Sequence, residues 1–386
     1  MNLFFLKTFT QITIKIIKLF KLGNGYTFPG YFILKFFPNI LSSKTFNYKK
    51  GIILISGTNG KTTTSKLVTD ILKGNGFKVA HNASGSNLLR GIVTCLFLDL
   101  NFFGKPSSDI AVLEVDEFAL PQVLDNLTPK VLVLLNLSRD QLDRYGETDT
   151  ILSRWINSLQ NLSTKTTLVL DATQPVLSIL KDIFKGTTES FNSFAPHGIH
   201  VKEAFNIKNV NASLKVCSLY KLNLENCKNI INNFQYAYGR GEQIVYKDIP
   251  FTIYLAKNPA SFTNNLETLI DTPTFNSLLF ILNDNIPDGR DVSWIYDVDT
   301  DLLKTFYNKV GVSSENIFIS GTRCYDLASR LSYAGFEISK DNVNKDLKKT
   351  LNLIESKKLK NSSFAVLPNY SAMLAFRKLT LGRSIL

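Results

Sequence analysis

Short runs of consecutive apolar residues alternate with amphipathic segments along the first part of the chain. The runs at 51–56, 110–115, 131–135 and 167–170 suit buried strands, and the segments at 61–73 and 148–160 place apolar residues at helical spacing. Buried strands that alternate with helices are typical of a mostly parallel sheet covered on both faces. The pattern therefore predicts an α/β domain here.

The pattern changes near residue 238. Segments 244–246 and 251–255 are expected to pair as a hairpin around the turn 247–250. Alternation then resumes, with predicted strands at 277–282, 317–320 and 364–367 and predicted helices at 300–309, 324–333 and from Tyr370. We therefore expect an N-terminal segment over 1–50, a central domain over 51–237 and a smaller C-terminal α/β domain over 238–386.

The N-terminal segment is basic. The formal net charge of the chain is +12, and ten lysines precede the first acidic residue, Asp70. Such an end suits an acidic partner, either a nucleic acid or an anionic membrane surface, although biased genome composition would also produce it. Lysines interrupt the apolar stretch 3–20, so a spanning helix is not expected. A basic amphipathic helix, lying on a membrane or packed on the protein itself, is expected instead.

Cysteine usage and motif content narrow the class of protein further. The four cysteines, Cys95, Cys217, Cys227 and Cys324, form no CxxC pair, which favours neither a zinc ribbon nor a disulfide framework. We therefore expect reduced thiols, as in a cytoplasmic protein. The basic N-terminal segment would allow such a protein to contact the inner face of the membrane. No RNA- or DNA-binding motif follows the basic segment, so nucleic-acid binding is not expected.

A Gly-rich turn joins the first apolar run to the helix after it, and it reads Gly57-Thr58-Asn59-Gly60-Lys61-Thr62. Backbone N–H groups at such a corner, together with the helix N-terminus, bind phosphate. Lys61 would reach the β- and γ-phosphates of a nucleotide, and the Thr62 hydroxyl would bind Mg²⁺. Ile55 stands where the full phosphate-loop motif has its first glycine. The alternative is an ordinary turn with a helix cap.

Acidic residues follow the strand predicted at 110–115, in the order Glu114-Val115-Asp116-Glu117. A carboxylate beyond the carboxyl end of such a strand can complete a magnesium shell, and Glu114 is the candidate. A solvated acidic turn is the alternative. Past the next strand, the same edge is expected to carry further polar side chains, namely Asn136, Arg139, Asp140 and Asp143.

Together these motifs resemble the Mur ligase superfamily. The loop and the acidic strand end precede Asn-x-x-x-Asp-x-x-Asp at 136–143, and residues 238–242 are similar to the superfamily's Gly-Arg-x-Glu link into its C-terminal domain. Within the superfamily, the chain resembles the MurT family, the synthetase subunits of lipid II isoglutaminyl synthase. The stretches that carry this resemblance are 86–92, 113–117, 139–147, 257–259, 283–285, 288–297 and 367–374.

The resemblance implies a fold, an activity and a site. The fold would be a Mur-ligase-like central P-loop domain with a parallel sheet, plus the smaller C-terminal α/β domain. The activity would be ATP-dependent amidation of the D-glutamate α-carboxylate of lipid II through an acyl phosphate, with Mg²⁺. A stand-alone Mur-type amino-acid ligase is the alternative. Lys61 would be catalytic, Thr62 and Glu114 would bind Mg²⁺, and ATP would contact Gly57, Thr58, Asn59, Gly60, Lys61, Thr62, Thr63, Asn136, Asn211 and Arg240.

Ammonia for this reaction requires a source. A glutaminase needs a thiolate paired with a histidine, and no cysteine stands beside any of the three histidines, His81, His197 and His200. The family uses a separate glutaminase, GatD, in a heterodimer, and the synthetase lends an aspartate that orients the partner's histidine. Asp291 is the candidate here, with Asp288 and Asp297 nearby. These acids could instead cap turns or bind ribose.

The chain departs from the family at two places. Family members carry a four-cysteine zinc ribbon where this chain has the short, cysteine-free stretch 187–205, so no zinc is expected. The Asn-rich segment that contacts the nucleotide in the family is degenerate here and reads Lys208-Asn209-Val210-Asn211.

Overall fold

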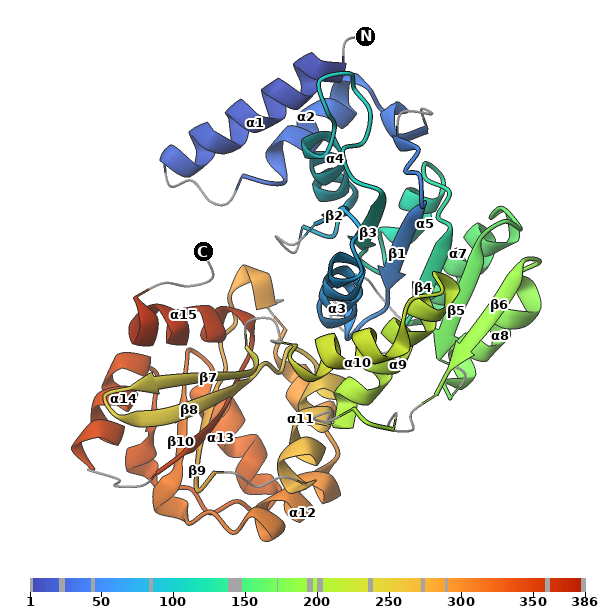
Figure 1. Ribbon diagram of the computed structural model, residues 1–386. Coiled ribbons are helices and arrows are strands. Elements are labelled where there is room, and N and C mark those ends of the chain that lie inside the picture. The colour runs from blue at the N-terminus through green and yellow to red at the C-terminus, as the bar shows by residue number, and fades with distance from the viewer. Residues whose placement is uncertain are drawn as a thin grey trace. The chain divides into compact units, whose positions relative to one another are not determined.

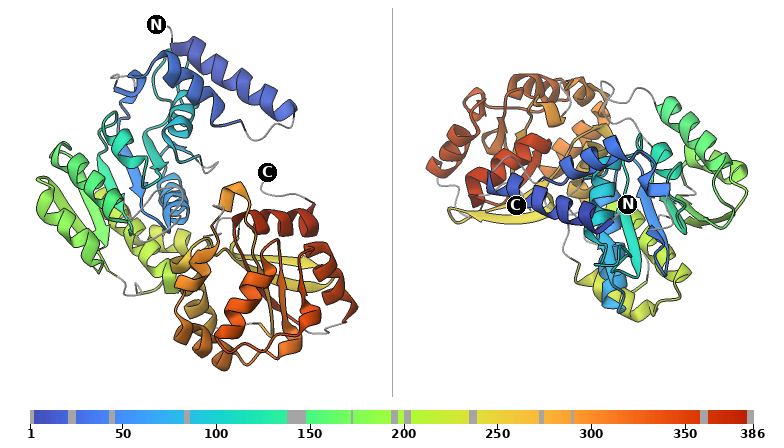
Figure 2. Two further views of the ribbon diagram at one scale, coloured as in Figure 1. Left: turned by 180° about the vertical axis from the view of Figure 1, so that it is seen from behind. Right: turned by 90° about the horizontal axis from the view of Figure 1, so that it is seen from above.

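The computed structural model describes residues 3–20, 25–42, 46–82, 86–137, 148–171, 173–192, 197–199, 204–234, 239–271, 275–288, 291–357 and 362–382. These residues form an N-terminal unit within Met1–Leu137 and Thr148–Gln235, and a C-terminal unit within Tyr236–Leu386. Figures 1 and 2 show the elements of each unit.

A six-stranded parallel sheet with the order β2-β3-β1-β4-β5-β6 forms the centre of the N-terminal unit. Strands β1, β3 and β4 are rich in branched apolar residues and are buried along their whole length. Such strands fit the middle of a sheet that is covered on both faces. The strands are β1 (Ile52–Ser56), β2 (Val79–His81), β3 (Ile110–Glu114), β4 (Val131–Leu134), β5 (Thr167–Asp171) and β6 (Thr187–Phe191).

Helices cover both faces of this sheet. On one face, Val68 of α3 and Val216 of α9 pack with Ile53 and Val133 of the strands. Helices α7 and α8 lie on the opposite face from α9, as Figures 1 and 2 show. Right-handed crossovers place α7 and α8 opposite α3, because α3 leads to a strand in the other direction along the sheet. The helices are α3 (Lys61–Gly74), α4 (Leu89–Leu98), α5 (Leu120–Leu124), α7 (Thr148–Gln160), α8 (Pro175–Ile183), α9 (Ala204–Leu219) and α10 (Leu224–Asn232).

Two further helices, α1 (Leu3–Leu19) and α2 (Phe28–Phe36), lie side by side at one end of this unit and both contact α4 (Figure 1). A Cβ on Gly30 of α2 would sit 1.8 Å from the Arg90 carbonyl oxygen of α4. The Gly30 N–H donates to Thr94 Oγ1 at 2.9 Å. The helix predicted over 3–20 is confirmed by α1, and the face of α1 that carries Thr10 and Ile14 packs on the protein itself.

The C-terminal unit also contains a six-stranded sheet, with the order β11-β10-β9-β12-β8-β7. All neighbours are parallel except β7, which runs antiparallel to β8. The strands are β7 (Arg240–Tyr246), β8 (Ile249–Tyr254), β9 (Ser277–Ile281), β10 (Ile317–Ser320), β11 (Val343–Asn344) and β12 (Phe364–Pro368).

Alternate residues of the central strand β9 face opposite sides of this second sheet. Leu278 and Phe280 pack with α11 (Pro259–Asp271), α12 (Thr300–Val310) and α13 (Cys324–Tyr333), whereas Leu279 and Ile281 pack with α14 (Leu347–Ser356) and α15 (Tyr370–Leu381). Because successive side chains of a strand point to opposite faces of the sheet, β9 contributes to two separate apolar cores. The predicted α/β fold class is confirmed in both units.

The predicted hairpin forms, but its predicted turn is too long. Residues Ile249 and Pro250 belong to β8, and Tyr246 pairs directly with Ile249. The turn consists of Lys247 and Asp248, whose φ angles are 49° and 63°. Two successive positive φ angles produce the twist that matches a two-residue hairpin, so the strands pair sooner than expected.

No helix in the described ranges is both long and apolar enough to cross a membrane. The four cysteines are free thiols; Cys217, Cys227 and Cys324 are buried and Cys95 is half-buried.

Gly311 offers a test of backbone strain in the C-terminal unit. It ends α12 at φ 63°, and an added Cβ would meet no described atom within 4 Å. We expect Gly311→Ala to lower the free energy of unfolding by about 1 kcal/mol through backbone strain alone. Gly311→Asn should lose less, because asparagine tolerates this conformation. Urea unfolding, with hydrogen exchange of the α12 amides, measures both; equal losses would contradict the explanation.

Candidate active site

The turn from β1 into α3 depends on two glycines. Gly57 has φ 137° and Gly60 has φ 86°, values that other residues rarely adopt. A Cβ on Gly57 would lie 2.8 Å from the Asn136 carbonyl oxygen, and a Cβ on Gly60 would lie 2.2 Å from Asn209 Oδ1. Both conformation and space therefore require glycine at these two positions of the turn.

Asn136, which follows β4, holds this turn with three hydrogen bonds. Its carbonyl oxygen accepts from the Thr58 N–H at 3.1 Å. Its side chain accepts from the Asn59 N–H at 2.8 Å and donates to the Asn59 carbonyl oxygen at 2.9 Å. The neighbouring strand thereby fixes the backbone of the turn in one conformation, which is the preorganisation that anion binding by backbone N–H groups needs.

The Lys61 ammonium lies inside this turn and makes a buried ion pair. It donates to the carbonyl oxygens of Gly57 and Thr58 and to Glu117 Oε2, the last at 2.7 Å. The side chains of Lys61 and Glu117 are only 8% and 1% exposed. An ammonium has three donors, so a phosphate oxygen that binds Lys61 must replace one of these acceptors.

The pairing of Glu117 with Lys61 was not predicted. The two residues are 56 positions apart, and no local pattern connects them. Trp155 Nε1 of α7 donates to the Glu117 carbonyl oxygen at 2.8 Å and so fixes the backbone that carries the carboxylate. The only signal in the sequence is the position of Glu117 shortly after a buried strand, beyond its carboxyl end.

Thr62 and Glu114, the predicted metal ligands, lie together. Thr62 Oγ1 donates to Glu114 Oε1 at 3.2 Å. Two oxygens bound at right angles to one Mg²⁺ ion are about 3.0 Å apart, given metal–oxygen distances of about 2.1 Å. The pair therefore fits two adjacent positions of a magnesium shell with almost no movement, and waters or phosphate oxygens would complete the shell.

Two asparagines hold Glu114 in place, Asn82 through the Glu114 backbone and Asn87 through the Glu114 carboxylate. Asn82 binds both the Glu114 N–H, at 2.9 Å, and the Glu114 carbonyl oxygen, at 2.8 Å, and Asn87 Nδ2 donates to Glu114 Oε1 at 3.2 Å. Glu114 and Asp116 are 4% and 7% exposed, so the alternative of a solvated acidic turn is wrong. Asn82 was not predicted, because it follows a strand of only three residues.

The Asn-rich segment contributes one residue to the turn. Asn209, on α9, approaches Gly60 and accepts from Thr64 Oγ1 at 3.3 Å. Asn211 Nδ2 instead donates to the Asn192 carbonyl oxygen at 2.7 Å. Among the other predicted residues, Thr63 is buried in the first turn of α3, and Arg240 begins β7 in the other unit. Three expected residues lie outside the described ranges, namely Arg139, Asp140 and Asp143.

A second polar cluster lies in the C-terminal unit, where β9 and β12 end side by side. Asp288 is 5% exposed and accepts hydrogen bonds from the Ser371 N–H, at 2.7 Å, and from Ser371 Oγ. Burial raises the pKa of Asp288 above its ordinary value, although the Ser371 hydrogen bonds oppose the rise. Asp291, three positions further along the chain, is exposed and accepts from the Ser293 N–H at 2.8 Å.

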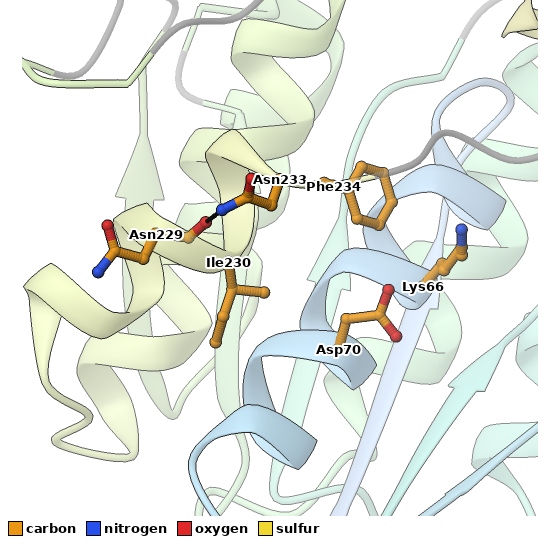
Figure 3. Close-up of a pocket in the computed structure, with 6 residues that line it drawn as sticks. All are labelled: Lys66, Asp70, Asn229, Ile230, Asn233 and Phe234. Atoms are coloured by element: carbon orange, nitrogen blue, oxygen red, sulfur yellow. Dashed lines mark hydrogen bonds between the residues drawn. The ribbon is translucent and has the colours of Figure 1, made fainter.

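In the described residues, no three His, Cys, Asp or Glu side chains form a metal-binding group. A pocket of about 460 Å³ lies between α3 and α10 (Figure 3), and in it the Lys66 ammonium lies 4.8 Å from the centre of the Phe234 ring. The turn residues 57–62 do not line this pocket, so it is separate from the candidate active site. Its lining consists of Lys66, Asp70, Asn229, Ile230, Asn233 and Phe234.

Two family models match the chain. The model of the Mur ligase middle domain matches residues 55–233, and the MurT ligase C-terminal model matches residues 255–373. The first match contains the turn, Glu114 and Asn136, and the second contains Asp288, Asp291 and Ser371.

Relatives similar to most of the chain share one name, lipid II isoglutaminyl synthase (glutamine-hydrolyzing) subunit MurT. The one from Streptococcus pneumoniae (strain ATCC BAA-255 / R6) is 28% identical, and the similarity covers 95% of this chain and 94% of the relative. The one from Staphylococcus aureus (strain COL) is 28% identical and covers 91% of each chain.

A solved structure, MurF ligase from Thermotoga maritima in complex with ADP, has the same fold. Its TM-score is 0.66 at 15% sequence identity, and the match covers 91% of this chain and 82% of that chain. The predicted Mur-ligase-like fold is therefore confirmed.

The contact between Gly60 and Asn209 can be isolated with a matched pair of variants. Gly60 and Gly76 have φ angles of 86° and 88°, but a Cβ on Gly76 would meet no described atom within 4 Å. Gly76→Ala should cost about 1 kcal/mol of stability through backbone strain, and Gly60→Ala should cost about 1–3 kcal/mol more through overpacking. Thermal unfolding of both measures the difference.

Adding Asn209→Ala to Gly60→Ala should recover part of the loss, because the clashing carboxamide is removed. If Gly60→Ala and Gly76→Ala are equally stable, the close approach of Asn209 is not real.

Proposed function

We propose, on the premise that this chain belongs to the MurT family of Mur ligases, that it is the ligase subunit that amidates lipid II. The substrate would be the D-glutamate α-carboxylate of the lipid II stem, and the product D-isoglutamine. The observation that carries the proposal is the arrangement of Lys61, Thr62 and Glu114 around the turn that begins α3. Because the substrate is carried by a membrane lipid, we place the reaction at the inner face of the membrane.

The turn would bind the phosphates of ATP. Backbone N–H groups at the start of α3 and the Lys61 ammonium offer donors to the transferring phosphate. Thr62 and Glu114 would hold Mg²⁺, which when bound neutralises charge on the phosphate oxygens. Lys61 would exchange Glu117 for a phosphate oxygen, and Glu117, fixed by Trp155, would keep the lysine positioned until then.

The proposed amidation has two steps. A carboxylate oxygen of the substrate attacks the γ-phosphorus, ADP leaves, and an acyl phosphate forms. Ammonia then attacks the acyl carbon, phosphate leaves with the former carboxylate oxygen, and the nitrogen loses a proton. Positive groups that stabilise charge on the transferring phosphate are the main means by which a protein accelerates such a step.

The cysteines of the chain are unsuited to release ammonia from glutamine. Burial raises the pKa of Cys95 to about 12, and it also raises the pKa of Cys324, so both thiols remain protonated and weakly nucleophilic at neutral pH. The hydrogen bond between the Cys217 and Cys227 thiols raises the pKa of Cys217 and lowers the pKa of Cys227. Both side chains are buried, at 3% and 0% exposure, so glutamine has no access to either thiol. We therefore propose that a separate glutaminase subunit of the GatD type supplies the ammonia.

Asp291 is the residue that we propose this glutaminase uses. It is exposed, and its carboxylate accepts a hydrogen bond from the Ser293 N–H at 2.8 Å, which holds the side chain in one orientation. A carboxylate held in this way can accept a hydrogen bond from a partner's histidine and fix its orientation.

The central test reconstitutes the chain with a glutaminase and measures amidation of lipid II. We expect the product to require ATP, Mg²⁺ and glutamine together, or ATP, Mg²⁺ and ammonia when the glutaminase is omitted. ADP release with an amino acid as acceptor and no ammonia would instead identify a stand-alone Mur-type ligase. Amidation from glutamine by this chain alone would refute the partner.

The role of Lys61 can be tested without unfolding the protein. Lys61→Met alone leaves Glu117 buried without its charge partner, which costs about 3–5 kcal/mol. The double variant Lys61→Met with Glu117→Gln removes both charges and should stay folded by thermal unfolding. We expect its ammonia-dependent amidation to fall at least about a hundredfold relative to the wild type. Glu117→Gln alone is a second comparison, in which Lys61 keeps two carbonyl acceptors, and its folding is checked in the same way. Full activity in the folded double variant would refute the role.

Asp291 should separate the two nitrogen sources. Asp291→Asn keeps an oxygen that can accept from the Ser293 N–H but loses the negative charge. We expect glutamine-dependent amidation to be lost while ammonia-dependent amidation is unchanged. The matched control is Asp297→Asn, another exposed acid of the same segment, which should leave both rates intact. Equal loss of both rates in Asp291→Asn would assign it a structural role.

A further inference from the structure

Helix α1 carries two apolar faces, and the protein covers only one of them. Thr10 and Ile14 are buried on the covered side. Phe5, Ile12, Ile16 and Leu19 are 71%, 51%, 48% and 77% exposed. At 3.6 residues per turn, these four side chains fall within roughly 60° of arc on the opposite side of the helix. A helix that is apolar on both sides normally has both sides covered.

The exposed apolar surface continues over neighbouring segments. Phe28, Phe32 and Phe36 of α2 are 51%, 39% and 58% exposed, and Phe102 and Phe103 of the turn after α4 are 69% and 82% exposed. We call this set, with the four residues of α1, the aromatic face.

Aromatic contacts join the parts of this face. The rings of Phe4 and Phe102 are 4.7 Å apart, those of Phe9 and Phe32 are 5.4 Å apart, and those of Phe32 and Phe36 are 4.9 Å apart. Lys7 Nζ also donates to the Leu100 carbonyl oxygen and ties α1 to the turn. The aromatic face is therefore a continuous part of the N-terminal unit.

The charges around the aromatic face all have one sign on the two helices. Lys15, Lys18 and Lys35 are exposed on α1 and α2, Lys105 is exposed in the turn, and no acidic residue precedes Asp70 in the sequence. Large apolar side chains bordered by lysines are typical of helices that lie in the interface of an anionic bilayer. A nucleic acid would match the charge but would leave the apolar side chains unburied.

We propose that the aromatic face docks the protein on an anionic membrane surface. The side chains of the aromatic face would enter the boundary between headgroups and acyl chains, while the lysines bind lipid phosphates. This proposal rests on the proposed function in one respect, because a lipid-borne substrate gives the docking its purpose.

The covered side of the same helices leads to the candidate active site. Gly30 of α2 is packed against Arg90 of α4, and α4 begins two residues after Asn87, which donates to Glu114. A short and rigid path therefore connects the docked helices to the proposed magnesium ligand. Docking would hold the site at a constant height above the membrane, where the headgroup of a lipid substrate lies.

The test measures sedimentation of the full chain with vesicles of phosphatidylcholine, with or without phosphatidylglycerol. We expect binding to the anionic vesicles that weakens with added salt. The triple variant Phe5→Ser, Ile16→Ser and Phe103→Ser should bind at least about tenfold more weakly. Lys15→Gln with Lys18→Gln should reduce the salt dependence.

Matched controls change residues of comparable exposure elsewhere. Ile179, Val245 and Ile286 are 48%, 68% and 78% exposed and lie outside the aromatic face. Serine at these three positions should leave vesicle binding unchanged. Equal binding by the wild type and the aromatic-face variant would overturn the proposal. The proposal would also be overturned if the wild type is a dimer that does not bind vesicles and the aromatic-face variant is a monomer. A second copy of the chain would then cover the aromatic face.

A second measurement separates this proposal from the proposed function. With the glutaminase present, the aromatic-face variant should keep its rate on a water-soluble lipid II analogue and lose rate on lipid II in vesicles. If neither the wild type nor the aromatic-face variant amidates either substrate, the proposed function is wrong. The vesicle-binding measurement still tests the membrane docking in that case.

Discussion

Asn136 fixes the turn between β1 and α3, because it accepts hydrogen bonds from the Thr58 and Asn59 N–H groups and donates one to the Asn59 carbonyl oxygen. A full phosphate-loop motif has an additional glycine, and this chain has Ile55 in its place. The turn is therefore shaped by contacts from outside it, through Asn136 on one side and Asn209 on the other. Because each contact comes from a different element, the turn exists only when the central sheet and α9 are assembled.

The remaining chemistry is arranged around this turn by the edge of the sheet. Strands β3, β1 and β4 are neighbours and end together, so Glu114, the turn and Asn136 meet at one edge. Burial then determines how the charged groups behave. Lys61 is satisfied by Glu117 and two carbonyl oxygens, and a buried ammonium without such partners would be strongly unfavourable. The ion pair thus stabilises a lysine that the proposed reaction uses only when phosphate replaces the carboxylate.

The structure also indicates what the chain leaves to other components. Three of its thiols are buried and Cys95 is half-buried, which supports the proposal that ammonia comes from another subunit. Its first two helices present an apolar surface that the fold does not cover, and the lysines beside that surface match an anionic bilayer. Under these proposals, the nitrogen source and the membrane would each meet a different part of the protein.

The sequence alone predicted four of the six strands of the central sheet and the candidate residues of the proposed active site. Apolar runs predicted β1, β3 and β4 because buried strands need consecutive apolar residues, and Lys61, Thr62 and Glu114 were found because they stand next to those runs. Strand β2 was missed, since three residues carry no period, and the hairpin turn was predicted too long, since the φ angles of Lys247 and Asp248 are not visible in composition. Only the tertiary structure decided that Glu117 pairs with Lys61, that Asn82 holds Glu114, and which side of α1 is covered. Those facts depend on the order of strands and the packing of helices, which join residues far apart in the chain and leave no local pattern.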